Sequence, residues 1–203
     1  DVPAEVAGLQ RSMDLNPRDP SLALSLGEGL AELRRYDQAG IAFRRALAIA
    51  PNDPEAYTGL AQLEVLQYAD VRAAMALLDK APVELHSGAE ILSERVELLL
   101  LQRDYKAAQQ AAESLRSGGR FVSPLSVLIL RARVSRLSGD TQGAKALCQQ
   151  ALGMATAIAS GGLNEAALHG EAVIPAVQAC LGHRAEALQA LQNVRALASK
   201  MDV

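Results

Sequence analysis

Hydrophobic residues recur three and four positions apart along most of the chain, in segments separated by proline, glycine, aspartate or asparagine. This spacing gathers the apolar side chains on one face of an α-helix. Aspartate followed by proline precedes two of these segments, at 19–20 and 53–54, and serine followed by proline precedes a third, at 123–124. Aspartate and serine cap helix N-termini, and proline suits the first helical position. The pattern predicts an all-α chain of short helices.

A fixed period relates the first two of these segments. Pro17 and Pro20 return as Pro51 and Pro54, each 34 positions later, with similar residues around them. A period of this length is typical of a repeat in which two antiparallel helices stack on the next pair.

The residue types within this period resemble the tetratricopeptide repeat (TPR) family. The small, large and proline positions of that family's repeat correspond here to Leu26, Gly27, Leu30, Ala39, Phe43, Ala46 and Pro51. Small residues at Gly27 and Ala39 let two helix backbones approach closely, and the larger side chains fill the space beside them. The resemblance covers nearly the whole chain and is strongest over 15–61. It implies an all-α TPR α-solenoid, a right-handed superhelix of antiparallel helix pairs.

The resemblance also implies one array over 1–203, with about five repeats after a leading half repeat. The expected units are a half repeat at 1–17 and repeats at 20–53, 54–85, 88–119, 123–160 and 164–199. Solenoids need polar caps, and neither end of the chain shows one. We therefore expect a fragment of a longer chain, or self-association through the uncapped ends. We expect the glycine-containing connections at 117–119 and 160–162 to be the least stable parts of the array.

Composition and charge narrow the classes of partner. Half of the residues are hydrophobic, but only 3% are aromatic, which favours helices over a β-sandwich. The net charge is -3, and the basic stripe Arg131, Arg133 and Arg136 has few aromatic residues near it to stack bases. We interpret that stripe as a solvated helix flank. No stretch reaches the roughly 20 apolar residues of a membrane span. We expect neither nucleic-acid binding nor a direct membrane span.

Candidate chemistry is sparse. His86, His169 and His183 are scattered, and His169 and Cys180 would lie roughly 16 Å apart on one helix, too far to share a metal. Cys148 and Cys180 occupy unrelated positions, and we interpret them as small buried hydrophobes that suit either cytoplasm or periplasm. The glycine pairs lack phosphate-binding contexts. We expect no enzyme activity, no metal and no cofactor.

The resemblance implies a concave surface that binds another protein or a peptide segment and is lined by the first helix of each repeat. The inward positions of the family correspond here to Glu28, Glu32, Glu55, Gln62, Leu66, Glu97, Leu101, Arg133 and Arg136, with Leu24 and Leu100 beside them. Such a groove would be acidic in its N-terminal half and apolar in its middle, with arginines after that. It would orient a partner segment that is basic at one end and acidic at the other. Leu24 and Glu28 replace the lysine and asparagine of the family's chaperone-tail clamps, so a carboxylate clamp is disfavoured.

The leading interpretation is a non-enzymatic scaffold or adaptor. The resemblance places such arrays in bacterial envelope assemblies, such as pilus assembly, secretion or exopolysaccharide export. The alternatives are a peptide-sensing regulatory domain of a larger protein, a secretion chaperone, or an appendage to an enzyme whose chemistry lies elsewhere.

Overall fold

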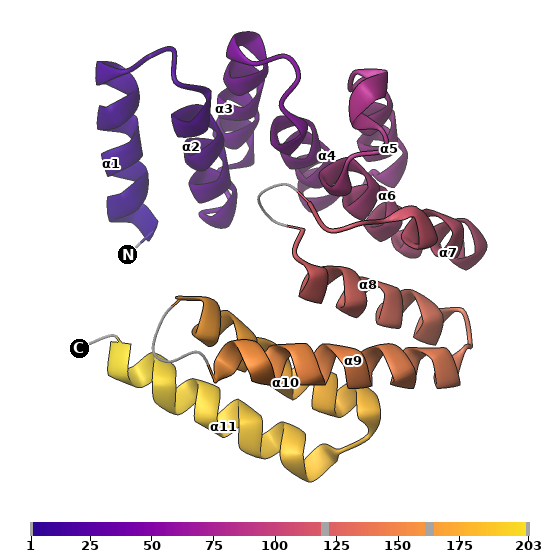
Figure 1. Ribbon diagram of the computed structural model, residues 1–203. Helices are drawn as coiled ribbons and strands as arrows, with labels where there is room; N and C mark the ends of the chain where they lie inside the picture. Colours follow the sequence, from indigo (N-terminus) through magenta and orange to yellow (C-terminus); the bar gives the residue numbers. More distant parts are fainter. Residues whose placement is uncertain (1, 119–121, 161–164, 202–203) are drawn as a thin grey trace. The chain divides into compact units, whose positions relative to one another are not determined.

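The computed structural model describes residues 2–118, 122–160 and 165–201, and the side chains of these residues except 165–170 and 197–201. Within these residues the chain forms eleven α-helices and no β-strand, as the hydrophobic pattern predicts (Figure 1). The helices divide into two compact units, residues 1–104 and 105–203. The boundary falls inside the expected repeat 88–119, and the division of the chain into repeats stays a prediction. We describe each unit by itself.

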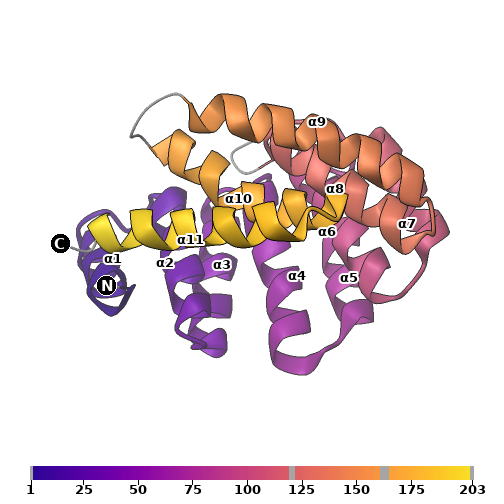
Figure 2. The same ribbon diagram turned by 90° about the horizontal axis from the view of Figure 1, so that it is seen from below.

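The first unit is a succession of helix pairs. Its elements are α1 (Val2–Leu15), α2 (Pro20–Glu32), α3 (Tyr36–Ile49), α4 (Pro54–Tyr68), α5 (Val71–Asp79), the 3-10 turn η1 (Val83–Leu85) and α6 (Ala89–Leu101). Each helix packs on the next along the chain up to α5 and α6, and α4 also packs on both α2 and α6. The helices α2 to α5 lie side by side in both views (Figure 1, Figure 2). This is the arrangement expected of stacked helix hairpins.

The caps that the sequence predicts are present. The carboxylate of Asp19 accepts a hydrogen bond from the Ser21 N–H at 2.9 Å, and that of Asp53 accepts one from the Glu55 N–H at 2.9 Å. Pro20 and Pro54 are the first residues of α2 and α4. Two prolines therefore sit where a missing N–H costs no intrahelical hydrogen bond.

Phe43 is a buried aromatic residue in the core formed by α1 to α4 of the first unit. Its side chain is 3% exposed and belongs to a cluster that includes Leu26, Leu30 and Leu60. A Cβ atom on Gly27 would lie 2.7 Å from Cε1 of Phe43, and one on Gly59 would lie 2.7 Å from Cζ. The ring therefore occupies space that only glycine leaves open on both α2 and α4.

The second unit contains five helices within the described residues. They are α7 (Tyr105–Ser114), α8 (Pro124–Leu137), α9 (Thr141–Ala159), α10 (Glu165–Leu181) and α11 (Arg184–Met201). Each packs on its successor, and the contact between α9 and α10 is the most extensive. The hydroxyl of Ser123 accepts a hydrogen bond from the Ser126 N–H at 3.1 Å, which confirms the third predicted cap.

A left-handed residue follows the first helix of each hairpin. Arg34, Ala69 and Arg103 have φ values of 58°, 54° and 60° after α2, α4 and α6. Gly139 and Gly182 have φ values of 90° and 85° after α8 and α10. A left-handed residue ends a helix by turning the chain, which lets the second helix begin within a few residues. The first unit makes this turn with non-glycine residues, which costs conformational energy.

Cys148 and Cys180 form a disulfide bond, so the expectation of two unrelated, unpaired cysteines is wrong. Cys148 lies on α9 and Cys180 on α10, with their Cα atoms 6.4 Å apart. The extensive packing of α9 on α10 brings together residues that are 32 positions apart in sequence. The bond joins the second helix of one hairpin to the first helix of the next.

Arg131 is a structural residue, and the expectation that it lies on a solvated flank is also wrong. Its Nε donates a hydrogen bond to the Ala112 carbonyl at 2.9 Å, and its Nη2 donates one to the Leu115 carbonyl at 2.7 Å. The last carbonyl groups of a helix have no partner within the helix. Arg131 of α8 therefore caps the C-terminal end of α7.

Candidate functional site

The candidate site is the first-helix face of the first unit, by which we mean the exposed surface of α2, α4 and α6. The contacts of α4 with α2 and α6 make these three helices neighbours, although they are separated in the chain by α3 and α5. Residues from three helices that are not consecutive in the chain are thereby brought onto one surface. This is the part of the predicted groove that a single unit contains.

Two leucines on this face are exposed to solvent. Leu66, near the end of α4, is 57% exposed, and so is Leu101, the last residue of α6. Their apolar surface is not used by the core of the unit. Because burial of a leucine side chain is worth about 1.5–3 kcal/mol, such residues are candidates for contact with a partner.

The predicted polar residues of this face fall into two groups. Glu32 and Gln62 are exposed, whereas Glu28, Glu55 and Glu97 are half-buried and take part in interactions within the protein. Exposed carboxylates can meet a partner without breaking contacts of the fold. Glu32 is therefore the acidic residue of the set that is best placed to face a partner.

Glu94 belongs to this face and was missed by the sequence analysis. The Nε2 atom of Gln62 on α4 donates a hydrogen bond to Oε2 of Glu94 on α6 at 2.8 Å. Burial raises the pKa of the Glu94 carboxyl, and the hydrogen bond from Gln62 opposes this shift. The inward positions that the resemblance implies in this part of the sequence include Glu97 and not Glu94, so no sequence signal singled out Glu94.

Leu24 and Leu100, which the resemblance assigned to the binding surface, lie in the interior. Leu24 is 4% exposed and Leu100 is 9% exposed. Leu24 joins the same cluster as Phe43. Their side chains stabilise the fold by burial and are not available to a partner.

The predicted basic end of the groove, Arg133 and Arg136, lies on α8 in the second unit. Arg136 is exposed and Arg133 is half-buried. Burial, followed by the nearby charge of Arg136, lowers the pKa of the Arg133 guanidinium. Their part in binding stays a prediction.

Most residues at the expected structural positions of the repeat are buried. Leu26, Leu30, Ala39, Phe43 and Ala46 are each no more than 7% exposed. Gly27 is buried too, whereas Pro51 is exposed in the turn between α3 and α4.

Within the described residues, no group of three or more histidine, cysteine, aspartate or glutamate side chains is arranged to hold a metal ion. His86 Nε2 lies 2.8 Å from the Ala81 carbonyl oxygen, and His183 Nδ1 lies 2.8 Å from Oε1 of Gln178. The side chain of His169 lies outside the described residues, as do parts of the connections at 117–119 and 160–162. None of the helices in the described ranges combines the length and apolar character needed to cross a membrane.

Comparison with known proteins finds sequences and structures that are similar to this chain. Residues 9–63 match the tetratricopeptide repeat family. No curated protein matches the chain. One similar solved structure is a thermophilic TPR protein of Thermus thermophilus, 22% identical, with a TM-score of 0.61 over 87% of this chain and 90% of that one.

Two further similar structures are those of PilW and of Pseudomonas aeruginosa pilF. PilW, described as a widely conserved type IV pilus biogenesis factor, is 18% identical with a TM-score of 0.61, over 97% of this chain and 86% of that one. Pseudomonas aeruginosa pilF is 19% identical with a TM-score of 0.60, over 84% of this chain and 72% of that one. At these identities the likeness is one of fold. Together with the match of residues 9–63, it shows that the chain has the all-α fold of tetratricopeptide repeat solenoids.

Proposed function

We propose that this chain is a non-enzymatic scaffold that binds a segment of another protein on the first-helix face of its first unit. The family supports this proposal, because the TPR is typically a module for protein–protein interaction. The observation that carries it is the exposure of Leu66 and Leu101, each 57%, on two neighbouring helices of one face.

The chemistry of this face indicates the kind of segment that fits. Leu66 and Leu101 offer apolar contacts, and Glu32 offers a carboxylate on α2. A partner with apolar side chains and a basic residue would bury the leucines and pair with Glu32. The charge would act on orientation and association rate more than on affinity.

We further propose that the scaffold works in a bacterial envelope assembly outside the cytoplasm. The disulfide between Cys148 and Cys180 supports this setting, because disulfides persist in the periplasm and are rare in a reducing cytosol. The fold likeness to PilW and to Pseudomonas aeruginosa pilF is compatible with a role in pilus assembly.

Site-specific photo-crosslinking in the source organism tests the proposal. A photoreactive amino acid is placed at Leu66 or at Leu101, and at Ala48, an exposed position on α3, as the matched control. We expect one discrete crosslinked protein from Leu66 and Leu101 and none from Ala48. Equal products from all three positions would contradict the proposed face.

The identity of the product separates the alternatives. A spread of unfolded proteins would indicate a secretion chaperone. A crosslink to a second copy of the chain would indicate self-association, and a free signalling peptide would indicate a regulatory domain.

A further inference from the structure

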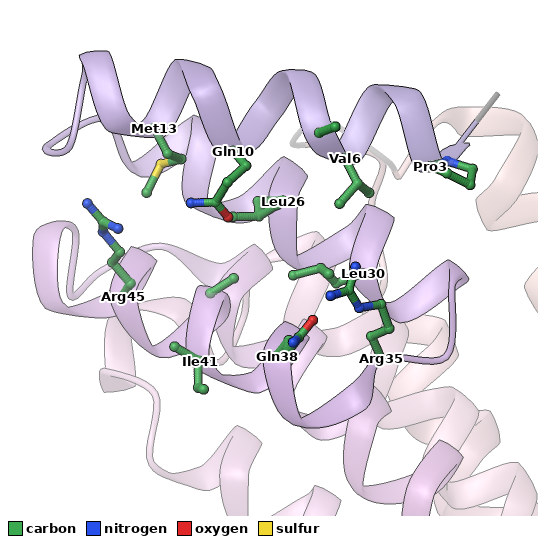
Figure 3. A pocket seen from close by; sticks show the side chains of 12 residues that line it. Pro3, Val6, Gln10, Met13, Leu26, Leu30, Arg35, Gln38, Ile41 and Arg45 are labelled. Atoms are coloured by element: carbon green, nitrogen blue, oxygen red, sulfur yellow. The ribbon is translucent and has the colours of Figure 1, made fainter.

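A groove of about 450 Å³ lies between α1 and α3 (Figure 3). Both helices pack against α2, which forms the floor of the groove. The apolar lining comes from all three helices and includes Val6, Met13, Leu26, Leu30 and Ile41. The lining includes none of the residues Glu32, Leu66 and Leu101 of the first-helix face, so the inference is independent of the proposed function.

The groove has an apolar wall that the fold does not cover. Ile41 on α3 is 63% exposed although it lines the groove. Opposite it, α1 is held close to α2, because a Cβ atom on Gly29 would lie only 2.8 Å from Cγ2 of Val6. The shape of the groove is therefore fixed by tight packing on one side, while its other side remains open to a ligand.

The two charged residues in the lining are both arginines, Arg35 and Arg45. They lie at opposite ends of the groove, with Gln38 and Ile41 between them along α3 (Figure 3). Arg35 precedes α3 as its N-cap and Arg45 lies ten positions later, which corresponds to about 15 Å along the helix axis. Arg45 donates one hydrogen bond, from Nη2 to the Pro17 carbonyl at 2.9 Å, and within the described part of the chain neither arginine forms an ion pair.

Amide side chains line both walls of the groove, Gln10 on α1 and Gln38 on α3. An amide offers both donors and an acceptor. An extended peptide presents free N–H and C=O groups, whereas a helix has already paired its own. The glutamines therefore favour an extended ligand over a helical one.

We propose that this groove binds an extended protein segment in which two carboxylates flank a short apolar stretch. The carboxylates pair with Arg35 and Arg45, and the apolar side chains lie on Leu26, Leu30 and Ile41. Because a strand rises about 3.3 Å per residue, two acidic residues four or five positions apart match the spacing of the arginines. A fatty acid carries only one carboxylate and would leave one arginine without a partner.

Peptide selection tests this proposal with defined probes. A phage-displayed library of random peptides is selected on the protein and counter-selected on the Arg35→Glu/Arg45→Glu variant. The selected peptides are then synthesised, and their dissociation constants are measured by fluorescence anisotropy. The matched control is Arg11→Glu/Arg44→Glu, which reverses two exposed arginines on α1 and α3 that do not line the groove.

We expect peptides with two acidic residues around apolar ones. Their affinity should fall about tenfold or more in Arg35→Glu/Arg45→Glu and stay unchanged in the control, because the first variant replaces two charge-assisted hydrogen-bond donors with like charges. Ile41→Asp, an exposed substitution that spares the core, should also weaken binding. Peptides without paired acids, equal loss in both arginine variants, or preferential binding of laurate in a competition assay would each overturn the proposal.

Discussion

The ring of Phe43 lies against the backbone of Gly27, and a Cβ atom at that glycine would lie 2.7 Å from Cε1 of the ring. The same ring also lies against Gly59 of α4, where an added Cβ atom would be 2.7 Å from Cζ of the ring. One aromatic side chain of α3 thus fills the space between two successive first helices. This contact holds α2 and α4 together, and those two helices carry part of the first-helix face.

Gly27→Ala should destabilise the protein although alanine is the better helix former. The added methyl group overpacks the Phe43 site, which typically costs about 1–3 kcal/mol. Gly8→Ala is the control, because a Cβ atom on Gly8 would meet only the Arg11 side chain, at 3.9 Å. This substitution should raise the free energy of unfolding by up to about 1 kcal/mol, since alanine is the better helix former. Urea denaturation of both variants compares their free energies of unfolding. Equal effects would show that the Phe43 contact is not restrictive.

Replacing the left-handed Ala69 with glycine should stabilise the protein. Ala69 has a φ of 54° in the turn after α4. Glycine adopts this region without the Cβ penalty of about 1–2 kcal/mol, so Ala69→Gly should raise the free energy of unfolding by about 1 kcal/mol. Gly139→Ala, at a φ of 90° in the equivalent turn of the second unit, should lower it. Thermal unfolding measures both variants. A lower melting temperature for Ala69→Gly, or a higher one for Gly139→Ala, would show that the left-handed backbone of these turns does not favour glycine.

Glu94 should make the folded protein less stable as the pH rises. Burial raises the pKa of its carboxyl above the usual 4.5, so the folded state binds this proton more tightly than the unfolded state. The associated stability is present at low pH and is lost as the pH rises through the folded-state pKa. Glu94→Gln keeps an acceptor for Gln62 and should raise the melting temperature at pH 7 but not at pH 4.

The control for this prediction is Glu84→Gln, an exposed substitution in η1. It should leave the melting temperature unchanged at both values of pH. If Glu94→Gln gives the same difference from the wild type at pH 4 and at pH 7, titration of Glu94 does not contribute to stability.

Removing the disulfide should destabilise the second unit. For a loop of 32 residues, the chain-entropy relation gives about 3–4 kcal/mol. We expect Cys148→Ala/Cys180→Ala to lower the melting temperature, and hydrogen exchange to quicken first in α9 and α10. A reducing agent should lower the melting temperature of the wild type and have no effect on the double variant. Free thiols in the protein as purified from its native compartment would contradict the bond.

The features that the sequence predicted correctly are mostly those that depend on neighbouring residues in the chain. Asp19, Asp53 and Ser123 cap helices as expected, because a cap depends on residues only two or three positions away. The buried set around Phe43 also follows from the repeat pattern. Asp70 and Asp140 cap α5 and α9 in the same way, and the same local signal could have found them.

The features that were missed depend on contacts between distant residues. The bond between Cys148 and Cys180 requires α9 to lie on α10, and Arg131 reaches the end of α7 from α8. Neither contact follows from spacing along one helix. Leu24 and Leu100 were misplaced because the rotation of a helix about its axis is set by the packing around it.

Binding of a partner by the first-helix face is tested most directly with the protein identified by crosslinking, by comparing its affinity for two matched variants of this chain. Glu32→Lys/Leu66→Ser alters this face, and Glu5→Lys/Leu15→Ser makes the same exchanges at exposed positions of α1. Isothermal titration calorimetry should show affinity reduced about tenfold or more for the first variant and unchanged for the second. Equal affinity of both variants with the wild type would contradict the claim.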